Sequence, residues 1–107
     1  MVTLVLLSAQ AYSGQTSGWG KITRLYVNAD STVLRVTFDR PTVDPDNCGN
    51  SSSFYMKEIM GENKVFVSAV MAAFHSQREV RFWIAGCTSI EYWGQKRPVL
   101  YDIEAKP

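Results

Sequence analysis

Two cysteines, Cys48 and Cys87, constrain the fold more than any other feature, because they are the only cysteines among 107 residues. A bond between them requires a fold that brings two distant positions together. We expect this disulfide, since an even cysteine count behind an apolar leader is typical of an exported protein. The alternatives are two free buried thiols or a metal pair. Two cysteines and the lone His75 fall short of a four-ligand zinc site.

The leader comprises residues 1–11, where the apolar run Val2–Leu7 is followed by the small residues Ala9 and Ala11. This pattern predicts a signal peptide and hence a secreted or periplasmic protein. No basic segment precedes the run, so the peptide is either truncated or begins upstream. The alternative is a buried first strand. We expect no membrane anchor, because a membrane-spanning helix needs roughly 20 apolar residues.

The remaining residues, 12–107, form one predicted domain, since so short a chain cannot build a second core. The formal net charge is +1, and lysines and arginines are scattered among nearly as many acids. A mixed, solvated surface explains this pattern. It argues against a nucleic-acid partner, which favours a concentrated positive face, and against a polybasic membrane surface.

Alternating apolar and polar residues predict strands at 21–27, 32–38, 54–59, 79–85 and 98–104, after a Gly/Ser-rich, irregular lead-in. The apolar stretch 64–77 predicts a helix that is largely buried. The loop 39–53 is rich in Pro, Asp and Gly and contains Cys48. Three strands, a helix and two further strands is the order of the five-stranded Greek-key barrel called the OB-fold. In that barrel the disulfide would tie the 39–53 loop to the end of the fourth strand.

Several segments resemble one family of bacterial proteins. They are the run Gly20–Val27, the loop cysteine Cys48, the Ala-rich helix and the strand Val80–Cys87. Together they are similar to the B subunits of subtilase cytotoxin and of the typhoid and pertussis-like toxins. The resemblance implies an OB-fold, an intradomain disulfide, assembly into pentameric rings, binding of cell-surface glycans and a partner A subunit.

Toxin B subunits of this type bind sialic acid through a serine shortly before the first strand. The nearest serine here is Ser17, whereas counting back from Ile22 places Gly18 at the matching position.

The sequence offers no convincing catalytic group and no cofactor motif. His75 and Ser76 are neighbours in the predicted helix and therefore point in different directions. Asp44 and Asp46 lie in the Pro-rich loop, where turn formation explains them better than calcium binding. We therefore expect a protein that is not an enzyme and that holds no metal.

Aromatic residues in predicted loops are the remaining indication of function. Trp19, Tyr92 and Trp93 could stack on the apolar face of a sugar, with Gln95, Lys96 or Arg97 hydrogen-bonding its hydroxyls. The tentative glycan-binding residues are Ser17, Trp19, Tyr92, Trp93, Gln95 and Arg97. The alternative is that Trp19 and Trp93 cover the barrel ends or lie in a subunit contact. Strand alternation places Trp83 in the core or an interface, so it is not a site candidate.

The sequence thus predicts a secreted, non-enzymatic binding module that recognises a glycan or protein surface and assembles as a ring. A second hypothesis is a small secreted enzyme or inhibitor that acts through the 39–53 loop. A third, an OB-fold nucleic-acid binder, is disfavoured by the balanced charge and by the disulfide.

Overall fold

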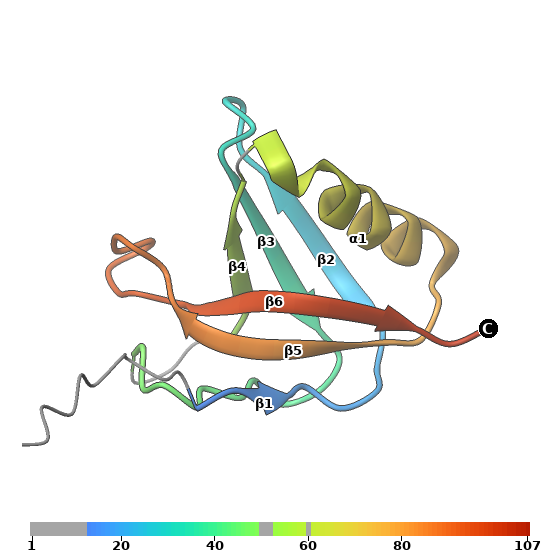
Figure 1. Ribbon diagram of the computed structural model, residues 1–107, viewed down its shortest axis with the longest axis horizontal. Coiled ribbons are helices and arrows are strands. Elements are labelled where there is room, and N and C mark those ends of the chain that lie inside the picture. The colour runs from blue at the N-terminus through green and yellow to red at the C-terminus, as the bar shows by residue number, and fades with distance from the viewer. Residues whose placement is uncertain (1–12, 50–52, 60) are drawn as a thin grey trace, which may run out of the picture.

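The computed structural model describes residues 13–49, 53–59 and 61–107, so the predicted signal peptide lies outside the described residues. The chain is mainly β with one helix, as predicted (Figure 1). Its elements are β1 (Gln15–Thr16), β2 (Ile22–Val27), β3 (Val33–Phe38), β4 (Tyr55–Glu58), a 3₁₀ turn (Gly61–Asn63), α1 (Lys64–Ser76), β5 (Val80–Cys87) and β6 (Pro98–Ala105). Each of the five predicted strands coincides with one of β2 to β6.

The described residues contain six strands rather than the predicted five, because β1 lies in the lead-in that was expected to be irregular. Gln15 pairs with Ile84, and Thr16 pairs with Trp83. A strand of two residues is too short to show alternation, and it exists only because β5 lies beside it. The sequence therefore gave no local signal for it.

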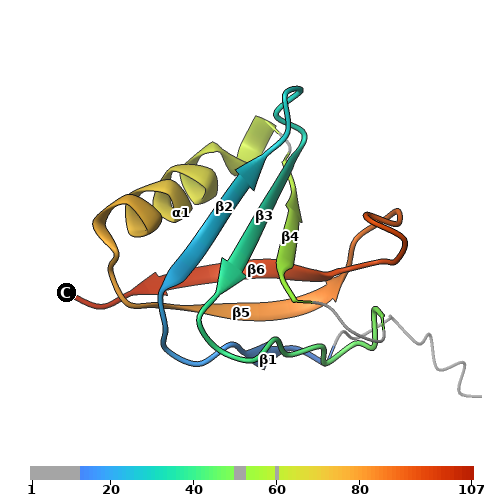
Figure 2. The ribbon, with the colours of Figure 1, turned by 180° about the vertical axis from the view of Figure 1, so that it is seen from behind.

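The six strands form one mixed sheet in the order β1-β5-β6-β4-β3-β2. The β4–β6 pair is parallel, with Met56 opposite Val99, and the other pairs are antiparallel. Between β1 and β2 the chain stays on β5, where Gly20 and Val80 exchange two backbone hydrogen bonds of 2.9 and 2.8 Å. The segment from β1 to β2 therefore links the two ends of the sheet, which curls around its core (Figure 2).

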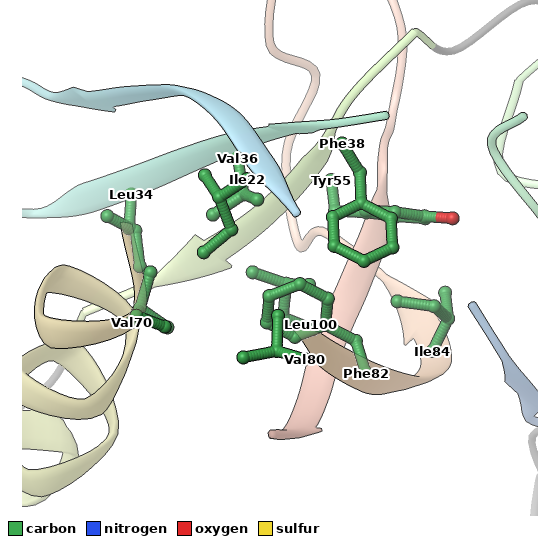
Figure 3. Packing of buried hydrophobic residues seen from close by; sticks show 11 residues of the cluster. Ile22, Leu34, Val36, Phe38, Tyr55, Val70, Val80, Phe82, Ile84 and Leu100 are labelled. Atoms are coloured by element: carbon green, nitrogen blue, oxygen red, sulfur yellow. The ribbon is translucent and has the colours of Figure 1, made fainter. Parts of the chain in front are cut away.

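The core lies inside this curled sheet and draws on every strand from β2 to β6 (Figure 3). Alternate residues of β5 point inward, so that Val80, Phe82 and Ile84 are buried. Phe82 meets Phe38 of β3 edge to face, with ring centroids 5.4 Å apart. The alternation of apolar and polar residues in the sequence thus identifies the side chains that face the core.

The helix is less buried than its composition predicted. Only Val70 and Ala73 are fully buried, whereas Val65 is 83% exposed and Met71 is 43% exposed. The helix packs on β2 and β6 along one face. This contact buries only part of the helix circumference. Phe66 and Phe74 are partly buried against the core, whereas Val65 and Met71 remain at the surface.

The predicted disulfide between Cys48 and Cys87 is confirmed, with the two Cα atoms 5.4 Å apart. It joins the loop after β3 to the last residue of β5, as the strand order predicted. Asp44 accepts hydrogen bonds from the backbone N–H groups of Cys48 and Gly49, and Asp46 accepts one from Gly86. Both carboxylates therefore shape the loop, in agreement with the turn interpretation.

Candidate functional site

The loop between β5 and β6, residues 88–97, projects from the end of the molecule opposite the C-terminus (Figure 1). It contains four of the predicted ligand-binding residues: Tyr92, Trp93, Gln95 and Arg97. Its base is closed by Thr88, whose backbone N–H donates to the Arg97 carbonyl at 2.9 Å and whose hydroxyl accepts from the Arg97 N–H at 3.0 Å. The loop is therefore a defined structure and not a loose connection.

Trp93 occupies a strained position at the tip of this loop. Tyr92 and Gln95 pair across a two-residue turn in which Trp93 has φ +53° and Gly94 has φ +87°. Two positive φ values are typical of a type I′ hairpin turn, which favours Asn or Gly over a bulky residue. Backbone strain of this kind concentrates at functional sites. The turn leaves the Trp93 side chain 52% exposed.

The side chain of Arg97 stabilises this turn through hydrogen bonds. Its guanidinium donates to the carbonyls of Tyr92 and Trp93, each at 2.8 Å, and the residue is only 6% exposed. These two bonds fix the backbone on either side of the strained position. Arg97 therefore positions the indole of Trp93 and does not itself extend into solvent.

The indole packs against an arginine on the outer face of the sheet. Arg35 of β3 lies over the rings of Tyr26, Phe54 and Trp93, with its Cζ 4.7, 4.9 and 4.7 Å from the three centroids. Tyr26 is the cross-strand partner of Arg35 in β2. We call Tyr26, Arg35, Phe54, Trp93 and Arg97 the Arg35 cluster; it combines stacking surfaces with cationic groups.

The Arg35 cluster carries two positive charges with no acid paired to either. Among the described residues the ion pairs are Arg81–Glu104 and Lys106–Glu79, neither of which includes Arg35 or Arg97. Burial, and then the charge of Arg35, lower the pKa of Arg97 below its ordinary value. The two guanidinium groups thus repel each other, and an anion beside them would relieve that repulsion.

Glu58 at the end of β4 anchors the other side of the loop. Its carboxylate accepts hydrogen bonds from the backbone N–H and the hydroxyl of Ser89, at 2.7 and 2.5 Å, and from the Tyr92 hydroxyl at 3.2 Å. Burial alone would raise the pKa of Glu58, but these hydrogen bonds outweigh it and hold the pKa below its ordinary value. The ionised carboxylate is therefore the form that holds the loop.

The other predicted residue of the loop, Gln95, turns away from the Arg35 cluster. Its side chain packs on Gly49, where an added Cβ would come within 2.7 Å of the Gln95 amide carbon. Its Nε2 is buried and has no hydrogen-bond partner among the described residues. Gln95 therefore connects the β5–β6 loop to the loop that carries Cys48.

Ser17 and Trp19 lie away from the β5–β6 loop. Ser17 is 4% exposed, and its hydroxyl accepts from the Phe82 N–H at 2.8 Å and donates to the Gly18 carbonyl at 2.9 Å. Trp19 lies between Arg81 and Lys106, at the opposite end of the β5–β6 hairpin. Of the six predicted residues, the Arg35 cluster therefore includes Trp93 and Arg97. Tyr92 and Gln95 share their loop but not the cluster, and Ser17 and Trp19 lie apart from it.

Three members of the Arg35 cluster were not predicted: Tyr26, Arg35 and Phe54. They fall in or beside predicted strands, whereas the predicted site drew its aromatic residues from loops. A signal was nevertheless present, because the turn after β2 sets a register in which Tyr26 faces Arg35 on the polar side of both strands. Phe54 and Trp93 reach this pair only through the tertiary fold.

The residues considered for catalysis or metal binding either lie apart or form hydrogen bonds within the fold. The Ser76 hydroxyl donates to the Ala72 carbonyl at 2.8 Å, and Asp44 and Asp46 bind backbone N–H groups. Within residues 13–49, 53–59 and 61–107, no three His, Cys, Asp or Glu side chains gather as metal ligands. Among the described residues no helix combines the length and the apolar character needed to cross a membrane.

No protein-family model, curated protein or solved structure matches this chain. The fold and the Arg35 cluster therefore supply the basis for a functional proposal.

Proposed function

We propose that this protein is an exported, non-enzymatic binding module with an OB-fold, which recognises a glycan through the Arg35 cluster. The strand order with a parallel β4–β6 pair and the Gly20–Val80 bridge supports the OB-fold. The disulfide and the apolar leader support export. OB-folds bind oligosaccharides and oligonucleotides on the sheet face formed by their second and third strands, beside the loop between their last two strands. In this chain the corresponding elements are β3, β4 and the 88–97 loop.

The observation that carries the proposal is the exposed indole of Trp93, held at a positive φ by Arg97 and flanked by Tyr26 and Arg35. A fixed aromatic ring can stack on the apolar face of a sugar without losing conformational entropy on binding. Arg35 lies beside it as a donor for hydroxyl or carboxylate groups. The unpaired charges favour a glycan that carries an acidic group.

Replacing Trp93 with alanine tests the proposal. On a glycan array the native protein should bind acidic glycans, and Trp93→Ala should reduce that binding by at least about tenfold, because stacking groups dominate such interfaces. Ile90→Ala is the matched control, since Ile90 is an exposed apolar residue of the same loop. Native protein that binds no glycan, or equal binding by native and Trp93→Ala, would contradict the proposal.

Ring assembly and an A subunit belong to the same proposal through the resemblance to toxin B subunits. A pentamer should show about five times the chain mass of 12.0 kDa in multi-angle light scattering. A monomer at high micromolar concentration would remove the ring from the proposal and leave glycan recognition to be judged on the array.

A further inference from the structure

A second candidate binding surface lies on the outer face of β1, β5 and β6. It shares no residue with the Arg35 cluster, and the function proposed for that cluster does not depend on it. A cavity of about 630 Å³ opens there, lined by Thr16, Arg81, Trp83, Asp102 and Glu104 among others. Thr16, Trp83 and Asp102 are cross-strand partners in one row, and Arg81 and Glu104 form the row two residues away. All five side chains therefore stand on the same face of the sheet.

Trp83 lines this cavity and does not point into the core, which was one of the two positions predicted for it; the other, an interface, stays a prediction. It is 43% exposed, because Phe82 and Ile84 on either side of it take the inward positions of β5. Its indole lies against Gly14, where an added Cβ would come within 2.6 Å of the ring. A side chain at position 14 would displace the indole, so the glycine allows the ring to occupy this position.

Three charged groups line the cavity around the indole, and together they carry a net negative charge. Glu104 is ion-paired with Arg81, whereas the carboxylate of Asp102 forms no ion pair or hydrogen bond with any described residue. The cavity thus has two carboxylates and one guanidinium around an aromatic platform. This charge opposes an anionic ligand and suits hydroxyl groups that donate to Asp102.

From this geometry we propose that the Trp83 cavity is a second binding site, specific for a neutral pyranose. The apolar face of the sugar stacks on the indole of Trp83, and Asp102 accepts hydrogen bonds from its hydroxyls. Small-molecule sites combine aromatic surface with a few placed polar groups, and here Asp102, Glu104 and Arg81 are the charged groups beside the indole. The site differs from the Arg35 cluster in charge, and so the two surfaces select different sugars.

The test follows the indole N–H signals of Trp19, Trp83 and Trp93 in ¹⁵N-labelled full-length protein by NMR. The probes are methyl glucoside, methyl galactoside, methyl mannoside, glucuronic acid and tetramethylammonium chloride, each to about 50 mM, which detects millimolar dissociation constants. At least one methyl glycoside should shift the Trp83 signal saturably. If no methyl glycoside shifts it, or if glucuronic acid or tetramethylammonium shifts it at a lower concentration, the proposal is overturned.

Two variants separate this site from the first. Asp102→Asn should weaken the response of Trp83 about fivefold, because a charged acceptor is replaced by a neutral one. Asp30→Asn, in the turn after β2, is the matched control and should leave it unchanged. Trp93→Ala should also leave the Trp83 response intact. Loss of glycan binding at the Arg35 cluster and loss of binding at the Trp83 cavity can therefore be told apart. An undiminished response in Asp102→Asn would contradict the assigned role of Asp102.

Discussion

At the residue scale, Ser17 shows how a predicted ligand-binding group can serve the fold. Its hydroxyl and its backbone N–H both bond to Phe82, at 2.8 and 2.9 Å, and so tie the lead-in to the central strand β5. The hydroxyl also donates to the Gly18 carbonyl. Because the residue is buried, these bonds are made without competition from water.

Replacing Ser17 with alanine should lower the free energy of unfolding by about 1–3 kcal/mol, because a buried N–H loses part of its hydrogen bonding. Urea unfolding followed by tryptophan fluorescence measures the change. Ser68→Ala, on the exposed side of α1, is the control and should change stability by less than about 0.5 kcal/mol. Equal effects of the two substitutions would show that the Ser17 hydroxyl is not structural.

At the scale of elements, the β5–β6 loop is held from two sides. Arg97 fixes the carbonyls of the turn, and the Glu58 carboxylate fixes Ser89 and Tyr92. These contacts keep the strained Trp93 in place beside Arg35. The loop therefore contacts β3 through Arg35 and β4 through Glu58, although β5 and β6 flank it in the sequence.

The Glu58 anchor predicts a pH dependence. Because its pKa is lower in the folded protein than in the unfolded chain, the stabilisation is complete above the ordinary glutamate pKa. It is lost as the pH falls through the folded pKa. The Trp93 indole signal in NMR should therefore change in this acidic range, as the loop loosens.

Glu58→Gln should abolish this acid transition, since an amide does not titrate. Glu91→Gln, a substitution at an exposed position of the same loop, should retain it. A transition that persists in Glu58→Gln would assign the pH response to another group.

At the scale of the whole molecule, the disulfide joins the two halves of the curled sheet. Cys48 and Cys87 are 39 residues apart in sequence, and the closed segment includes β4 and α1. The loop after β3 has little regular structure of its own and depends on this bond and on the aspartates beside it.

A Cys48→Ser/Cys87→Ser double variant should lose about 4 kcal/mol of unfolding free energy on the chain-entropy account of disulfides. Urea unfolding with and without a reductant tests this, because the reductant should destabilise the native protein and leave the double variant unaffected. A loss below about 1 kcal/mol would mean that the loop is held without the bond.

The sequence predicted the strands β2 to β6 closely, because their alternating residues record which face of the sheet is buried. It predicted the cysteine pair because no other partner was present for either cysteine. It missed β1, whose two residues pair only because β5 adjoins them, and it overestimated the burial of α1. Apolar composition does not reveal how much of a helix the sheet covers.

The sequence by itself predicted the succession of β2 to β6 along the chain, the pairing of the two cysteines and the aromatic loop, since these depend on local alternation and on residue counts. Only the tertiary structure decided which aromatic residues share a surface. It placed Tyr26, Phe54 and Trp93 around Arg35, buried Ser17 against β5, and turned Trp83 outward over Gly14. The physical reason is that a ligand site is built from side chains of several strands, whose proximity depends on sheet register and closure and not on any one segment.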